Sequence, residues 1–164
     1  MPYSVKAVAN EFLAIGFQSG DTITQMKLQK LVYIAHGWNL AIFNEPLIND
    51  QIQAWKHGPV IPVLYNEFRG VGSSNITEYA TDISVDEESF NILYETPRIA
   101  TAEENTHLLI QKIWNKYGHL SGPQLSSLTH MPNTPWSDIY RSNQHNLPIS
   151  NEIIKSHYND LLRR

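Results

Sequence analysis

The stretch Met26–Phe68 reads MKLQKLVYIAHGWNLAIF, then NEPLIND, then QIQAWKHGPVIPVLYNEF. Its first part places apolar side chains at helical spacing behind Thr24, a residue type that caps helices well. Asn44-Glu45-Pro46 interrupts that pattern and predicts the end of the helix. The stretch therefore predicts a long helix with one wide apolar face made of Leu28, Leu31, Val32, Ala35, Trp38 and Ile42.

A short corner follows this helix and leads into a second one. Leu47-Ile48 and Ile52–Trp55, on either side of Asn49-Asp50, predict a small hairpin or two short extended pieces. Gly58-Pro59 is expected to end the extended structure. Pro62 falls in the first turn of the next helix, where its missing N–H costs nothing. That helix is expected to end near Gly70, with Val60, Leu64 and Phe68 directed inward.

Capping residues and glycines mark the remaining helices. Ser4 opens a first helix that ends at Gly16–Gly20, and Thr101 with Glu104 predicts a capping box for a helix closed by Gly118. Ser121 caps a short helix through His130, residues 136–140 form one or two turns, and Ser150 opens the last helix. Residues 70–100 predict irregular or short extended structure, an edge strand being one option. The inward positions are Val5, Val8, Ala9, Phe12, Leu13, Leu108, Leu109, Ile113, Tyr117, Leu125, Leu128, Ile153, Ile154, Tyr158, Leu161 and Leu162.

These patterns together predict a mainly α fold with a small β-hairpin, a compact helical bundle in which residues 1–164 form one domain. With 41% hydrophobic and 17% charged residues, the 164-residue chain has the composition of a soluble globular protein. It contains no cysteine, which excludes disulfides, thiolate metal ligands and a cysteine nucleophile. The longest apolar run, Leu31–Phe43, is shorter than the ~20 residues that span a bilayer. We therefore expect a cytoplasmic protein that does not contact membranes.

The net charge of −4 is unevenly distributed. Residues 70–104 carry eight acidic side chains against Arg98 alone. This segment would repel phosphate backbones and attract a basic partner, although a charge run of this kind more often marks a solvated loop and helix start. The candidate partner-binding acids are Asp82, Asp86, Glu87 and Glu88.

The sequence contains none of the usual catalytic or metal-binding patterns. Its seven histidines include no pair at helical spacing, and there is no His-Glu-x-x-His, Gly-x-Ser-x-Gly or phosphate-binding loop. We therefore expect no metal, no cofactor and no catalytic residue, and hence a protein that is not an enzyme.

One cluster still permits an enzymatic hypothesis. His57 with Tyr65 and Lys27 would provide a general acid and base in a small enzyme. The structural alternative, which we favour, makes Trp55 a core aromatic at a strand end and lets His57 hydrogen-bond to nearby backbone.

Residues 102–130 have the spacing of a helix-turn-helix, whose second helix would offer Gln124, Ser127 and His130 to DNA bases. However, the segment Tyr117–Tyr140 contains no lysine or arginine to contact phosphates. Binding to nucleic acid is therefore the weaker hypothesis, and a packing role for these helices is favoured.

Three elements together resemble the Panacea domain family, the SocA-like antitoxins of bacteria and phages. They are the Lys-Leu-Gln-Lys-Leu-x-Tyr helix at Lys27–Tyr33, the Ala-Trp-x-x-Gly-Pro-Val corner at Ala54–Val60, and the Leu-Ser-x-Leu-Thr-His and Pro-Trp pair ending at Trp136. The resemblance implies a scaffold role for Lys27, Leu28, Lys30, Leu31, Tyr33, Trp55, Gly58, Pro59, Val60, Tyr65, His130 and Trp136.

The resemblance implies an antitoxin that binds and neutralises a toxin encoded beside it and performs no reaction of its own. A relative that delivers its toxin to a cytoplasmic protease supplies an alternative, a proteolytic adaptor. Since residues 70–100 match no part of the family pattern, we infer that this variable segment sets the choice of toxin. Asp82, Asp86, Glu87 and Glu88 are then candidate toxin-binding residues.

Overall fold

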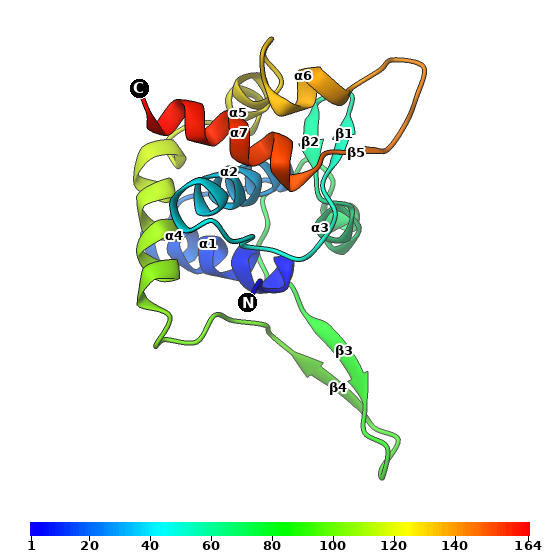
Figure 1. Ribbon diagram of the computed structural model, residues 1–164. Coiled ribbons are helices and arrows are strands. Elements are labelled where there is room, and N and C mark those ends of the chain that lie inside the picture. The colour runs from blue at the N-terminus through cyan, green and yellow to red at the C-terminus, as the bar shows by residue number, and fades with distance from the viewer.

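The computed structural model describes residues 1–164 and consists mainly of helices, with two small antiparallel sheets (Figure 1). This confirms the predicted fold class. The helices are α1 Val5–Ser19, α2 Gln25–Phe43, α3 Pro62–Phe68, α4 Glu104–Tyr117, α5 Gly122–Thr129, α6 Pro135–Ile139 and α7 Asn151–Leu162, with a 3-10 turn η1 at Arg69–Val71. The strands are β1 Gln53–Trp55, β2 Gly58–Val60, β3 Asp82–Val85, β4 Ile92–Glu95 and β5 Leu147–Pro148.

Helix α2 occupies the centre of the molecule, and the other helices surround it (Figure 1). It packs against α1, α3, α4, α5, α7 and β2. Because neighbours cover most of its circumference, its polar residues Gln29, Lys30, His36 and Asn39 are buried along with its apolar ones. The predicted single apolar face is therefore too narrow, and Ile42, expected inside, is 48% exposed at the end of the helix. No helix combines the length and hydrophobicity that crossing a bilayer requires.

The ends of the first two helices follow their capping residues as predicted. The side chain of Ser4 accepts a hydrogen bond from the backbone of Lys6, and that of Thr24 accepts one from Lys27. Gly20 closes α1 with a φ of 76°, a left-handed conformation that glycine adopts without strain. Gly16, the other predicted end point, lies inside α1 instead.

The first sheet has the strand order β2-β1-β5, and its hairpin differs from the predicted one. Gln53 pairs with Val60 and Trp55 with Gly58, so the turn lies at Lys56-His57 and Asn49-Asp50 precedes the sheet. Gly58-Pro59 therefore forms a strand rather than ending one. Proline is tolerated there because β2 is an edge strand of the sheet.

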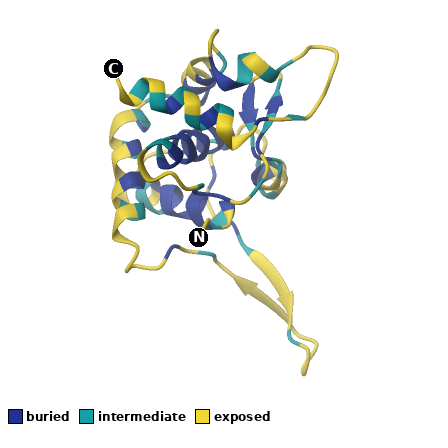
Figure 2. Ribbon diagram, in the orientation of Figure 1, coloured by how far each residue is buried: buried dark blue, intermediate teal, exposed yellow.

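The second sheet contains only β3 and β4, in the segment that the sequence left as irregular or short extended. Its hairpin projects away from the helical body (Figure 1). Figure 2 colours it as exposed along nearly its whole length. We call β3, β4 and the turn between them the arm.

The remaining helices have the predicted order, with local differences. Helix α4 begins at Glu104, and its N-cap Glu103 makes no side-chain capping bond, so the predicted Thr101–Glu104 capping box is wrong. Leu108, Leu128 and Leu162, expected inside, are exposed because no element covers those faces of α4, α5 and α7. Helix α5 does begin with a capping box, formed by Ser121 and Gln124.

Candidate functional site

The Trp-to-Val corner, residues 55–60, is held against α2 by a buried lysine. The Nζ of Lys30 donates a hydrogen bond of 2.6 Å to the carbonyl oxygen of Pro59. Gly58 has a φ of 115°, and a Cβ there would lie 3.1 Å from Lys30 Nζ and 3.3 Å from Thr129 Oγ1. A glycine is therefore required at this point by both the backbone conformation and the close approach of α2 and α5.

Two glutamines of α2 extend this attachment beyond the corner. The Gln29 amide accepts a hydrogen bond from the Ile61 N–H at 2.9 Å and donates one to the Ile61 carbonyl at 3.1 Å. Gln25 donates to the carbonyl of Tyr65 in α3 at 2.9 Å. The buried polar face of α2 thus makes hydrogen bonds to backbone groups of the segment that follows the corner.

Helices α5 and α6 hold the corner from the other side. The hydroxyl of Ser126 donates to the His57 carbonyl, and the indole N–H of Trp136 donates to the Trp55 carbonyl, each at 2.6 Å. His130 packs edge-on against Trp136, with ring centroids 5.3 Å apart. The corner is therefore a joint at which residues from three regions of the sequence meet.

Lys27 has a different role from the one that the enzymatic hypothesis gives it. Its ammonium donates to the carbonyl of Gly118 at the end of α4 and lies 5.2 Å from the centre of the Trp114 ring. Burial lowers its pKa. Lys27 thus connects α2 to α4 and does not line the cavity beside His57.

The outer side of the corner borders a cavity of about 540 Å³ whose lining includes Trp55, His57 and Tyr65. The rings of Trp55 and Tyr65 pack edge-to-face, with centroids 4.9 Å apart. The structure therefore brings together two of the three residues of the enzymatic hypothesis and leaves Lys27 out. His57 is exposed, and its backbone carbonyl, rather than its ring, makes the contact with α5.

Lys30 makes the stability of this joint depend on pH. The side chain is 2% exposed, and burial lowers its pKa from 10.5 to about 7. Above pH 7 the folded protein therefore binds one proton fewer than the unfolded chain, so stability rises with pH until the unfolded lysine also titrates. We expect the free energy of unfolding to rise by about 2 kcal/mol between about pH 7.5 and about pH 9.

Urea unfolding at three pH values across this window measures the effect. The matched variant Lys30→Met keeps a side chain of similar length, and most of the rise should disappear in it. Lys27, whose pKa is also lowered, contributes in the same direction and remains in both proteins. An equal slope in the two proteins would contradict the assignment to Lys30.

The helix-turn-helix hypothesis gains no support from the structure. Gln124 accepts a hydrogen bond from the Ser121 N–H at 2.8 Å, and His130 packs on Trp136, so both are occupied within the body of the protein. Ser127 alone of the three is exposed without such a contact. Separately, no group of three or more His, Asp or Glu side chains lies together in a way that could hold a metal ion.

The arm presents an uncovered apolar surface. Ile83 pairs with Tyr94 and Val85 with Ile92, and directly paired residues lie on the same side of a sheet. These four side chains form what we call the apolar face. Ile83 is 66% exposed and Tyr94 is 69% exposed, and Phe90 in the turn is 80% exposed. An apolar surface of this kind on a projecting strand pair is typical of an interaction site.

Buried polar contacts fix both ends of the arm to α1. The amide of Asn10 donates to the carbonyls of Ala80 at 2.9 Å and Pro97 at 2.8 Å, and accepts from the Ala80 N–H at 2.8 Å. Glu11 accepts two hydrogen bonds from the Arg98 guanidinium, at 2.8 and 3.1 Å. Burial alone would raise the pKa of Glu11, but the bonds from Arg98 and Ile99 outweigh it and lower that pKa.

The four acids singled out in the sequence occupy two different parts of the arm. Asp82 lies at the root, where its carboxylate is 3.1 Å from the Nζ of Lys6. Glu87 and Glu88 are exposed in the turn, and Asp86 accepts hydrogen bonds from the backbone and hydroxyl of Ser89 there. Only the turn acids are free of the body, so a charge-based contact would use the tip.

Sequence reasoning missed the apolar face and its attachment. The alternation Ile83-Ser84-Val85 was a usable signal for a half-covered strand, but the run is too short to stand out. Asn10 and Glu11 carry no signal of their own, because their partners lie 70 to 88 residues away.

Comparison with known proteins places the chain in a family. The family model described as "Antitoxin SocA-like, Panacea domain" matches residues 28–137, which include most of α2, the corner, the arm and α5. The chain belongs to this antitoxin family, and the resemblance seen in the sequence is confirmed.

A curated relative agrees with this assignment. Antitoxin SocA of Caulobacter vibrioides (strain NA1000 / CB15N) is 32% identical to this chain over 163 residues, which cover 96% of this chain and 84% of the relative. No solved structure matches the chain.

Proposed function

We propose that this protein is an antitoxin that neutralises a cognate toxin by direct binding, and that the arm is its toxin-binding surface. Membership of an antitoxin family supports the antitoxin role, and it favours a role without catalysis. The single observation that supports the arm is its apolar face, which no part of this chain covers.

The physical argument concerns the stability of the arm. An isolated two-stranded hairpin is only marginally stable in water, and here every strand residue is exposed. A partner that covers the apolar face would remove Ile83, Val85, Ile92 and Tyr94 from water. Because those side chains are exposed in the free protein, their burial is available to drive association.

Charge narrows the kind of partner. From Asp82 to Glu95 the chain carries five acidic side chains and no basic one. A toxin with a basic surface, as proteins that handle RNA have, would be steered toward the arm and would pair with Asp86, Glu87 and Glu88 at its tip.

The attachment of the arm to α1 supports a way in which binding would inhibit the toxin. Asn10 and Glu11 hold both ends of the hairpin on α1, so the apolar face has a defined direction relative to the body. A rigidly presented face loses less conformational entropy on binding than a free loop would. The arm would then cover the toxin's active surface or hold an inactive conformer of the toxin.

Co-expression with the toxin encoded in the neighbouring gene tests the proposal. We expect growth to be rescued and the two proteins to co-purify as a complex. The variant His57→Gln should rescue growth as well, since the proposal gives His57 no reaction to perform. Failure of the wild-type protein to rescue growth or form a complex would overturn the antitoxin role, and loss of rescue in a folded His57→Gln protein would favour the enzymatic hypothesis.

A further inference from the structure

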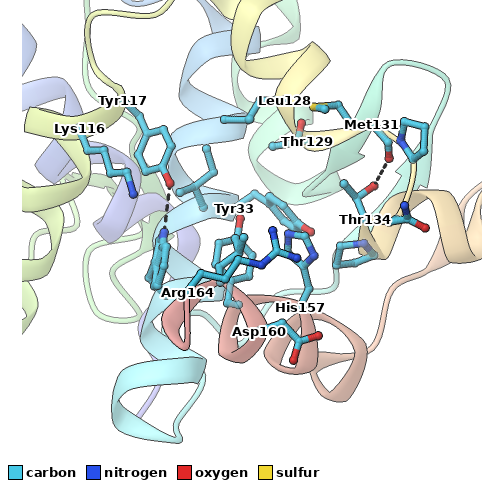
Figure 3. A pocket seen from close by; sticks show the side chains of 17 residues that line it. Tyr33, Lys116, Tyr117, Leu128, Thr129, Met131, Thr134, His157, Asp160 and Arg164 are labelled. Carbon is cyan, nitrogen blue, oxygen red and sulfur yellow. Dashed lines mark hydrogen bonds between the residues drawn. The ribbon is translucent and has the colours of Figure 1, made fainter.

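A cavity of about 700 Å³ lies between α2, the end of α4, α5 and α7 (Figure 3). It is separate from the arm, which leaves the body on the far side of α1 (Figure 1). Its volume is within the range of small-molecule sites in proteins. Its wall contains four aromatic side chains, those of Tyr33, Trp38, Tyr117 and Tyr158.

Tyr33 in this wall has an unusual hydroxyl group. The side chain is 2% exposed, and its hydroxyl is the one buried side-chain nitrogen or oxygen atom in the protein that has no hydrogen-bond partner. A buried polar group without a partner destabilises the fold, so such groups call for an explanation. Burial raises the pKa of Tyr33 well above its ordinary value, so the hydroxyl keeps its proton and can donate.

Three other polar side chains that line the cavity donate to partners within the protein. The Thr129 hydroxyl donates to the Leu125 carbonyl at 3.0 Å, and the Thr134 hydroxyl donates to the Met131 carbonyl at 2.7 Å. The Trp38 indole donates to the Tyr117 hydroxyl at 3.4 Å. Tyr33 is thus a buried donor beside the cavity whose hydroxyl is left without a partner.

The charged residues of the wall favour an anion over a cation. Lys116 and Arg164 are basic and Asp160 is acidic (Figure 3). Burial lowers the pKa of His157, so this ring is neutral near pH 7 and adds no charge. The excess is one positive charge, placed around an interior of aromatic rings.

We propose that this cavity binds a small aromatic carboxylate, with its ring among the aromatic side chains and an oxygen atom accepting the hydrogen bond of Tyr33. The aromatic wall matches a planar ring, because rings pack edge-on or offset at the distances found here, such as the 5.3 Å between Trp38 and Tyr158. The carboxylate supplies the oxygen that accepts the hydrogen bond of Tyr33, and its negative charge is opposite to that of Lys116 and Arg164.

Two probes with the same ring test this site. Indole-3-carboxylate carries the acceptor and indole lacks it. Titration of each into the ¹⁵N-labelled protein should give saturable shifts at the Trp38 indole and at the amides of α7. Ligand efficiencies for fragments place the dissociation constant of indole-3-carboxylate at about 1 mM.

The variant Tyr33→Phe removes only the hydroxyl. It should bind indole-3-carboxylate at least about fivefold more weakly and indole equally well, the cost of one lost hydrogen bond. It should also be no less stable than the wild type, because the hydroxyl has no partner in the free protein. Tyr65→Phe, in the other cavity, is the matched control and should change neither affinity.

Three results would overturn the proposal. They are the absence of saturable shifts with indole-3-carboxylate, shifts confined to the cavity beside Trp55, and equal affinities in wild type and Tyr33→Phe. The measurements use this protein alone, so they are independent of whether the arm binds a toxin.

Discussion

Replacing three residues of the apolar face, Ile83→Thr, Ile92→Thr and Tyr94→Thr together, should weaken toxin binding at least about 100-fold. The physical reason is the loss of apolar area that a partner would cover, which at ~25 cal/mol per Å² amounts to about 3 kcal/mol or more. Threonine is β-branched and retains the strand preference of the hairpin. The melting temperature should change little, since all three side chains are exposed in the free protein.

The measurement is a titration of inactive toxin by calorimetry, beside thermal unfolding of each variant. Leu108→Ser with Leu162→Ser is the matched control, because these leucines are also exposed but lie on the helical body. It should bind like the wild type. Unchanged affinity in the threonine variant would show that the arm is not part of the toxin-binding surface.

Neutralising Asp86, Glu87 and Glu88 instead should slow association with the toxin, most strongly at low salt, with a smaller effect on dissociation. Unchanged association rates in the neutralised variant would contradict the contribution of these acids.

Gly37→Ala should destabilise the protein by about 3 kcal/mol or more, although alanine favours a helix over glycine by ~1 kcal/mol. A Cβ at position 37 would lie 2.1 Å from Cε2 and 2.3 Å from Cδ2 of Tyr158. The Tyr158 ring of α7 is buried and packs edge-on against Trp38 and Tyr33 of α2, so a Cβ at position 37 would displace it from these contacts. Either the ring would lose this packing or helix α7 would have to separate from the central helix.

Thermal unfolding measures this effect, and a loss of this size lowers the melting temperature of a protein this long by roughly 6–12 °C. Gly70→Ala is the control, since no atom lies within 4 Å of its added Cβ and its stability should be unchanged within about 0.5 kcal/mol. Combining Gly37→Ala with Tyr158→Leu should cost less than the two separate changes added together. A stability equal to or above wild type in Gly37→Ala would show that α7 does not pack on α2 as described.

The sequence predicted the helices well because their signals are local. A capping hydroxyl and its N–H partner are two or three residues apart, as with Ser4 and Lys6 or Thr24 and Lys27. The apolar period of α1 and the proline at the start of α3 act over equally short distances. The errors at Leu108, Leu128 and Leu162 arose because contacts with distant elements decide whether a helix face is covered.

The candidate site was less accessible to sequence reasoning. The Lys27–Tyr33 motif and the corner could be recognised together in the sequence. The physical reason for their occurring together could not. Lys30 and Gln29 serve backbone groups of Pro59 and Ile61, which are 29 and 32 residues away. The acids of the arm could be identified by their charge. The apolar face depends on the pairing of β3 with β4, which could not be predicted because six residues separate the two strands.

From its amino acids alone, this protein could be assigned a mainly helical fold, a membership in the Panacea antitoxins and an acidic segment suited to a basic partner. These properties rest on composition, on short-range spacing and on a motif that can be read along one chain. The tertiary structure alone determined that α2 is central and that the arm stands away from the body with an uncovered apolar face. It alone also showed that the Tyr33 hydroxyl, in a residue that lines a cavity, has no hydrogen-bond partner. Burial and hydrogen bonding depend on groups brought together from distant parts of the chain, and only the folded backbone specifies which groups those are.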